Sequence, residues 1–164
     1  MTEQELNYEL LLLLGCGIEN GKIYDYDTQQ YLIYNGNYIT TPDSLIVHKR
    51  DVRFDPLRNS KLAEYLVNVM INKEAQENGL YVTVMSTVDN PESNPPCIGR
   101  AITLTTNHGT IVTGYYYNYC IACIELIHRL AQVPTDFSFL RSFDYTKSQL
   151  LEMYNARDKG RNKK

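Results

Sequence analysis

The sequence predicts an α+β protein, in which a mainly antiparallel sheet of hairpins packs against two or three helices, with extra helices at the N- and C-termini. The spacing of apolar residues along the chain predicts, in order, a helix, three strands, a helix, three strands and two helices. Two Asn/Gly turns join neighbouring strands, as is typical of hairpins. Neither a repeat nor a linker divides the 164 residues, so we expect one domain over 1–155 and a basic tail over 156–164.

The first half of the chain predicts a helix followed by short strands. Residues 3–14 carry leucines at helical spacing and acidic residues in the first turn. Apolar and polar residues then alternate over residues 22–40 on both sides of Asn35-Gly36, a dipeptide that accepts the positive φ angles of a hairpin turn. Residues 44–54 alternate in the same way, so we expect another strand there.

The middle of the chain predicts a helix and a strand. Asp55-Pro56 is a typical helix beginning, with Asp as the cap and Pro in the first turn. Asn78-Gly79 is a typical helix end, because glycine accepts the left-handed conformation. Residues 80–88 are rich in β-branched side chains and predict a strand, which a proline-containing loop over 90–97 follows.

The last third predicts a hairpin and two helices. Residues 107–109, Asn-His-Gly, separate two β-branched stretches as a hairpin turn would. Residues 118–132 then have helical periodicity. Thr146 and Gln149 have the spacing of a capping box, so we expect a last, short helix after them.

The charge of the chain is unevenly distributed. Its net charge is −3, yet the tail carries five basic groups and one acidic group. An acidic body argues against a dedicated nucleic-acid-binding protein, whereas the tail is suited to contact phosphate or an acidic partner. The residues that would make this contact are Arg157, Lys159, Arg161, Lys163 and Lys164.

Two apolar features predict a protein interface. The sequence has 14 tyrosines and no tryptophan, and tyrosine suits interfaces because it combines a large apolar ring with a polar tip. The first helix is apolar on more than one face, as in a helix that is deeply buried or docked on a partner. The candidate interface residues are Leu6, Leu10, Leu11, Leu13, Leu14, Tyr115, Tyr116 and Tyr117.

The CxxC pair, Cys120 and Cys123, is best interpreted as part of the core. On a helix both thiols fall on one apolar stripe, where cysteine behaves as a small hydrophobic residue. Cys16 and Cys97 stand alone in predicted loops, so the sequence offers no four-ligand zinc site. The opposite face of the helix would carry Glu125, His128, Arg129 and Gln132, with Glu125 spaced to pair with Arg129.

The sequence predicts no catalytic residues, no metal site and no cofactor. Asp25 and Asp27 would share one face of a strand, but no third ligand for a cation is identifiable. His108 and Cys120 lie at opposite ends of a mostly extended stretch, too far apart to share a proton. His48 lies in a basic cluster that strand alternation divides between two faces.

We therefore expect a non-enzymatic structural subunit of a larger assembly, in contact with copies of itself or with other subunits. A small bacteriophage virion component, such as a neck, tail-terminator or head-associated protein, suits its size and class. One alternative is a small enzyme or ligand-binding protein with a tyrosine-lined pocket that includes Asp25, Asp27, His48 and His108. Another is a monomeric regulator that binds one protein partner.

The sequence predicts neither a secretory signal nor a membrane span. The only apolar run near the N-terminus is short, and the residues before it are acidic rather than basic. Four cysteines in such a chain indicate reduced thiols. We expect the protein in the cytoplasm or in a virion.

Overall fold

The computed structural model describes residues 2–19, 22–34, 39–40, 54–90, 99–132 and 137–161. The described elements are α1 (Glu3–Leu13), β1 (Cys16–Glu19), β2 (Lys22–Asp25), β3 (Gln30–Tyr31), β4 (Ile33–Tyr34), β5 (Ile39–Thr40), α2 (Ser60–Asn78), β6 (Val82–Asp89), β7 (Arg100–Thr106), β8 (Gly109–Val112), α3 (Tyr119–Leu130), the 3-10 helix η1 (Phe137–Phe143) and α4 (Lys147–Arg161).

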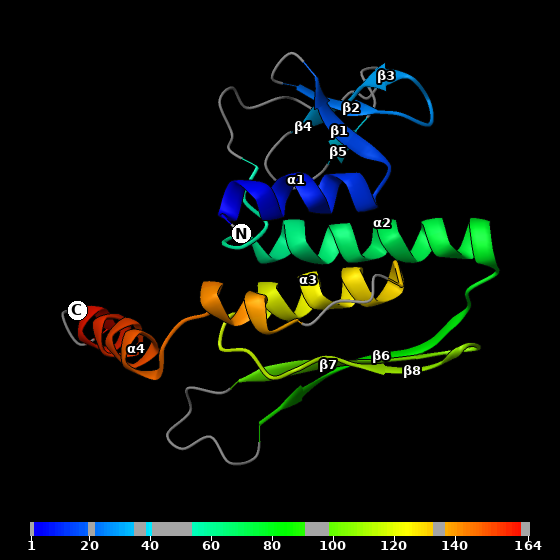
Figure 1. Ribbon diagram of the computed structural model, residues 1–164. Helices are drawn as coiled ribbons and strands as arrows, with labels where there is room; N and C mark the ends of the chain where they lie inside the picture. Colours follow the sequence, from blue (N-terminus) through cyan, green and yellow to red (C-terminus); the bar gives the residue numbers. More distant parts are fainter. Residues whose placement is uncertain are drawn as a thin grey trace.

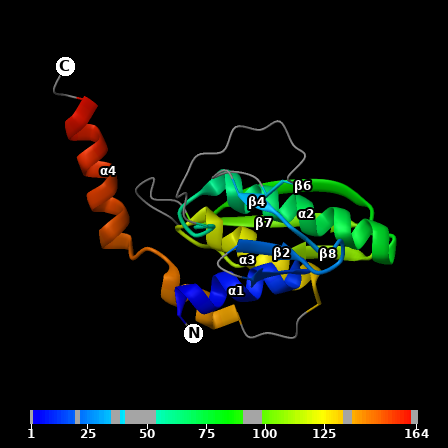
Figure 2. The same ribbon diagram turned by 90° about the horizontal axis from the view of Figure 1, so that it is seen from above.

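The elements form layers that confirm the predicted α+β class (Figure 1). The small strands β1–β5 lie on one side of α1 and α2, α3 lies beneath these helices, and the sheet β6–β7–β8 forms the opposite side. All the described strand pairs are antiparallel. In both views α4 extends away from the layered body (Figure 2).

Helix α3 is the centre of the core. It packs against α1 and α2 on one side and against β7 and β8 on the other, so all of its side chains except Tyr119 and Arg129 are buried. Burial of this kind is the main favourable term in folding, at about 25 cal/mol per Å² of apolar surface. Fully buried side chains from the surrounding elements include Leu6, Leu10, Leu62, Leu66, Ile102 and Leu104.

Most predicted caps and turns are confirmed, because they depend on neighbouring residues only. Gly79 ends α2 in the left-handed conformation with φ 66°, and Thr146 and Gln149 form the expected reciprocal hydrogen bonds before α4. The predicted beginning of α2 was wrong. Asn59 caps this helix by accepting the Leu62 N–H, while Asp55 accepts two hydrogen bonds from Arg58.

Two other predictions have different outcomes. The last helix is longer than expected, because α4 continues to Arg161 and includes much of the segment that we interpreted as a tail. Residues 44–53 of the strand predicted over 44–54 lie outside the described residues, and Phe54 is not in a strand. The turn at Asn35-Gly36 also lies outside them, although β4 and β5 on either side of that turn do pair.

Candidate interaction surface

The sheet β6–β7–β8 has a buried face and an outer face. On β7, Ile102 and Leu104 are fully buried on the side of α3, and strand alternation turns Thr103 and Thr105 to the other side. Residues that are paired across strands share a face, so the strand registers identify the rest of the outer face. The side chains that face outward and are at least partly exposed are Val84, Ser86, Val88, Thr103, Thr105, Thr110 and Val112.

This outer sheet face contains no charged side chain. Val84 and Val112 are each 54% exposed, and no described helix covers this side of the sheet in Figure 1. The charged residues nearest to it in sequence, Asp89 and Arg100, form an ion pair at 3.3 Å, and the register places them on the other face. The core of a protein interface is likewise depleted in charged residues, so this face suits contact with a partner.

Strand β6 is exposed on both faces, and the main contacts of α3 with the sheet are made to β7 and β8. Met85 is paired with Leu104 and therefore points to the helix side, yet it is 43% exposed. The strand forms one edge of the described sheet and carries no charge from Val82 to Val88. Native proteins usually protect such an edge with charges, proline or a neighbouring segment.

A tyrosine cluster lies on the strands β1–β3, on the other side of the helices. The Tyr24 ring packs edge-to-face against Tyr26 and Tyr31, with ring centroids 5.6 and 5.1 Å apart. Tyr26 and Tyr31 remain 44% and 39% exposed. This cluster is a second surface that suits protein contact.

The predicted interface residues divide between core and surface. Leu6, Leu10, Leu11 and Leu14 are buried within the chain itself, and Leu13 packs against the same core. The four buried leucines stabilise the fold and offer no surface to a partner in this conformation, which corrects our expectation for them, whereas Leu13 is partly exposed. Among the three tyrosines, Tyr115 is 40% exposed, Tyr117 is half-buried and Tyr116 is buried.

Tyr116 and Glu125 belong to a buried polar network. The Glu125 carboxylate, only 2% exposed, accepts the Tyr116 O–H at 2.6 Å, the Arg129 Nε–H at 2.8 Å and the Gly114 N–H at 3.2 Å. Arg141 lies over the Tyr116 ring at 4.9 Å. Burial and the bond to Glu125 raise the pKa of Tyr116 above its usual range. The predicted pair of Glu125 and Arg129 is confirmed. Of the predicted polar face, Arg129 and Gln132 are exposed, whereas Glu125 and His128 are buried, which corrects our expectation for these two.

His128 is also buried. Its Nε2 lies 2.8 Å from a carboxylate oxygen of Glu9 and its Nδ1 lies 2.8 Å from the Ile124 carbonyl oxygen, while Phe137 and Phe139 contact the ring by their edges. The ring thus connects α1, α3 and η1. Both ring nitrogens are occupied, so His128 has a structural role.

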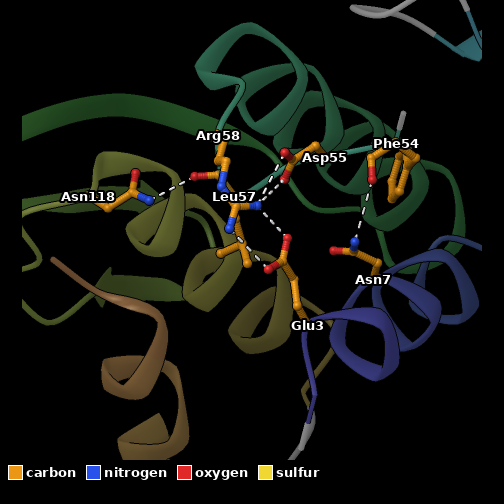
Figure 3. A network of polar contacts seen from close by, with 7 residues as sticks. All are labelled: Glu3, Asn7, Phe54, Asp55, Leu57, Arg58 and Asn118. Carbon is orange, nitrogen blue, oxygen red and sulfur yellow. Dashed lines mark hydrogen bonds and ion pairs between the residues drawn. The ribbon is translucent and has the colours of Figure 1, made fainter. Parts of the chain in front are cut away.

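A second polar network joins α1 to the turn before α2 (Figure 3). The Arg58 guanidinium donates a hydrogen bond of 3.1 Å to the Glu3 carboxylate and another of 3.1 Å to the Asp55 carboxylate. Beside it, Asn118 donates from its side-chain amide to the Leu57 carbonyl oxygen at 2.7 Å. Asn118 also caps α3, so these contacts hold the beginnings of three helices together.

Within the described part of the chain, two cavities lie beside these networks. One, of about 170 Å³, is lined by Glu74, His108 and Arg129 among others, but Glu74 accepts a hydrogen bond from Asn78 and Arg129 is held by Glu125. The other, of about 220 Å³, lies beside Arg58 and Asn118. Glu74 and Arg129 are therefore bonded within the chain and are not free to act on a substrate, whereas no side-chain partner of His108 is found among the described residues.

The polar groups of the alternative tyrosine-lined pocket do not converge within the part of the chain that the structure describes. Asp25 accepts the Asp27 N–H at 3.0 Å and the Thr28 hydroxyl at 2.8 Å, and so stabilises the turn after β2. His108 lies in the turn between β7 and β8, on the opposite side of the helices. His48 is outside the described residues.

The CxxC pair is confirmed as core. Cys120 and Cys123 are free thiols that are 4% and 1% exposed. Burial raises the pKa of Cys120 to about 11 and that of Cys123 to about 12, which is opposite to the lowered pKa of a redox-active thiol. Among the described residues no group of three or more His, Cys, Asp or Glu side chains could hold a metal ion.

The predicted phosphate contacts lie at the end of α4. Arg157 is exposed on this helix, and Lys159 and Arg161 belong to its last turn. Lys163 and Lys164 are outside the described residues. Of the helices in the described ranges, none has the length and apolar character needed to cross a membrane.

Comparisons with protein-family models, with curated proteins and with solved structures found no match for this chain.

Proposed function

We propose that the protein is a non-enzymatic interaction subunit of a larger protein assembly, and that it binds its neighbours through the outer sheet face. One observation carries this proposal: seven outward-facing side chains on three strands form a surface without charge, and no described element covers it. The core of a protein interface is likewise poor in charge and rich in apolar atoms.

The buried polar side chains are hydrogen-bonded within the chain, which supports a non-enzymatic role. Glu125 and His128 are buried and bonded to partners within the chain, and the thiols of the CxxC pair are held protonated in the core. Our more specific proposal is a small component of a bacteriophage virion, such as a neck, tail-terminator or head-associated protein. In that setting the basic end of α4 would contact an acidic neighbour or packaged nucleic acid.

A charge placed on the outer sheet face tests the proposal. Val112→Lys adds a cation to a side chain that is already 54% exposed, so the fold should tolerate it. Gln76→Lys adds the same charge to an exposed position on α2 and is the matched control. In cells that make the protein naturally, we expect the unaltered chain and Gln76→Lys to sediment with a larger complex, and Val112→Lys to be released from it.

Two outcomes would contradict the proposal. The unaltered chain could sediment at the size of a small isolated protein, which would show that no large assembly contains it. Alternatively, Val112→Lys could remain in the complex as fully as Gln76→Lys, which would show that the outer sheet face is not the contact surface.

A further inference from the structure

We propose that β6 is a dimerisation strand. In this arrangement the free edges of two copies pair antiparallel about a two-fold axis at Ser86, and two three-stranded sheets become one continuous sheet. The inference rests on the proposed function, because it names one partner of an interaction subunit. It concerns the edge of the sheet, whereas the proposed function concerns its outer face.

The hydrogen bonds show which backbone groups of β6 are directed to the free edge. The Asn90 N–H donates to the Gly99 carbonyl oxygen at 2.8 Å, so residue 90 is directed to the β7 side. Backbone groups alternate along a strand, and residues 84, 86 and 88 therefore share that direction. The N–H and C=O groups of Met85, Thr87 and Asp89 are then directed to the opposite side, the edge of the sheet.

The hydrogen bonds of β7 independently show which residues of β6 and β7 direct their backbone groups toward each other. Arg100 exchanges both of its backbone hydrogen bonds with Tyr116, and the Thr113 N–H donates to the Ile102 carbonyl oxygen at 3.0 Å. The even-numbered residues of β7 are thus directed to β8. Its odd-numbered residues are directed to β6, where the register pairs them with residues 84, 86 and 88.

Among the described residues, no strand pairs with the free edge of β6, and the strand itself carries little of the usual protection. The strand has eight residues, seven of them without charge and none of them proline, and its only irregularity lies at its beginning, between Val82 and Val84. The other edge strand of this sheet, β8, has four residues. A long, regular and uncharged edge is the kind that pairs with another strand.

The strand is complementary to itself in the register centred on Ser86. Val84 then lies opposite Val88 of the second copy on the outer face, and Met85 lies opposite Thr87 on the inner face. Asp89, the only charged residue of β6, lies opposite Thr83 and meets no second carboxylate. Pairing thus satisfies the free backbone groups, sets no like charges opposite each other and joins the two outer sheet faces into one surface.

The first test is a disulfide across the two-fold axis. The two Ser86 residues would form a non-hydrogen-bonded pair with Cα atoms about 4.5 Å apart, within the range of about 4.4–6.8 Å that a disulfide spans. We expect Ser86→Cys to form a disulfide-linked dimer under mild oxidation, and the matched control Thr110→Cys on β8 to remain unlinked. Every variant also carries Cys97→Ser, since Cys97 lies outside the described residues. Equal linking of the two variants would overturn the register.

The second test uses charge at the same position and measures mass by light scattering over a concentration series. The unaltered protein should reach twice the chain mass of 18.9 kDa. Ser86→Lys and Ser86→Glu should each be folded monomers, because they place like charges opposite each other, while an equal mixture of the two should recover the dimer. Thr110→Lys should remain a dimer. A monomeric unaltered protein, or a dimeric Ser86→Lys, would overturn the proposal.

The outcomes separate this inference from the proposed function. A purified monomer whose Val112→Lys variant is still released from a complex in cells would refute the β6 dimer and support the proposed function through other partners. A Ser86 disulfide dimer in a protein that sediments in cells no larger than a dimer would support the inference and refute the larger assembly.

Discussion

The buried carboxylate of Glu125 should be essential for stability. It accepts hydrogen bonds from Gly114, Tyr116 and Arg129, and its side chain is 2% exposed. The substitution Glu125→Gln keeps the shape of the side chain but replaces one acceptor oxygen with an NH₂ donor. The Tyr116 hydroxyl, which can also accept, is the only one of the three groups that can accommodate this donor. Even in that arrangement the charge-assisted hydrogen bonds to the carboxylate are lost, and the charge of Arg129 loses its partner.

The magnitude follows from the type of hydrogen bond that is lost. A hydrogen bond to a charged group contributes about 1.5–3 kcal/mol. Arg129 is 40% exposed and can recover part of its solvation, so the larger cost of about 3–5 kcal/mol for a fully buried unpaired charge does not apply. We expect Glu125→Gln to lower the free energy of unfolding by about 2–3 kcal/mol.

Urea unfolding measures this loss. The chain has no tryptophan, so far-ultraviolet circular dichroism is the appropriate signal. Glu152→Gln, at an exposed position on α4, is the matched control and should change stability by no more than about 0.5 kcal/mol. A change for Glu125→Gln as small as that of the control would refute the role that we assign to the buried network.

The remaining predictions concern the thiols, the end of α4 and Arg58. Burial raises the pKa of Cys16, Cys120 and Cys123 from about 9 to 11 or 12, so the folded state binds their protons more tightly than the unfolded state does. The free energy of unfolding should therefore fall as the pH rises from 9 to 11, and urea unfolding at several pH values measures this fall. A free energy of unfolding that stays constant over this range would contradict the prediction. Deletion of residues 157–164 should leave the melting temperature unchanged and weaken retention on a phosphate-bearing column; equal retention would exclude phosphate contact. Arg58→Ala should lower the free energy of unfolding in urea by about 1 kcal/mol or less, because the Arg58 side chain is 56% exposed. A larger loss would contradict this and show that the contacts of Arg58 contribute more to stability.

Local signals account for what the sequence predicted correctly. The Asn107–Gly109 turn, the Gly79 helix end and the capping box at Thr146 each depend on a few adjacent residues, and the structure contains all three. The Asp55 cap was wrong because a nearby asparagine, Asn59, competes for the same role with its own side-chain oxygen.

The polar face of α3 shows why the rest could not be predicted. Helical spacing indicated that Glu125 and His128 would be exposed, since charged and polar residues on one face usually meet water. In the fold Glu125 meets Tyr116 from the preceding segment, and His128 meets Glu9 from the far end of the chain. Such pairs form only when the layers assemble, and a periodicity within one helix contains no information about them.

The same reasoning applies to the candidate surface. The alternation of β-branched residues predicted the strands, but their outer face and free edge depend on where α3 lies over the sheet. The N-terminal leucines carried the stronger interface signal in the sequence, and they are core because α1 packs against α3.

The most direct test of the central claim is photo-crosslinking from the outer sheet face in cells that make the protein naturally. A photoreactive amino acid is placed at Val112 or, as the control, at Gln76 on the exposed side of α2. The account predicts a discrete crosslinked protein product from Val112 and none from Gln76. Absence of a product from Val112, or the same products from both positions, would contradict the claim that this face binds a partner.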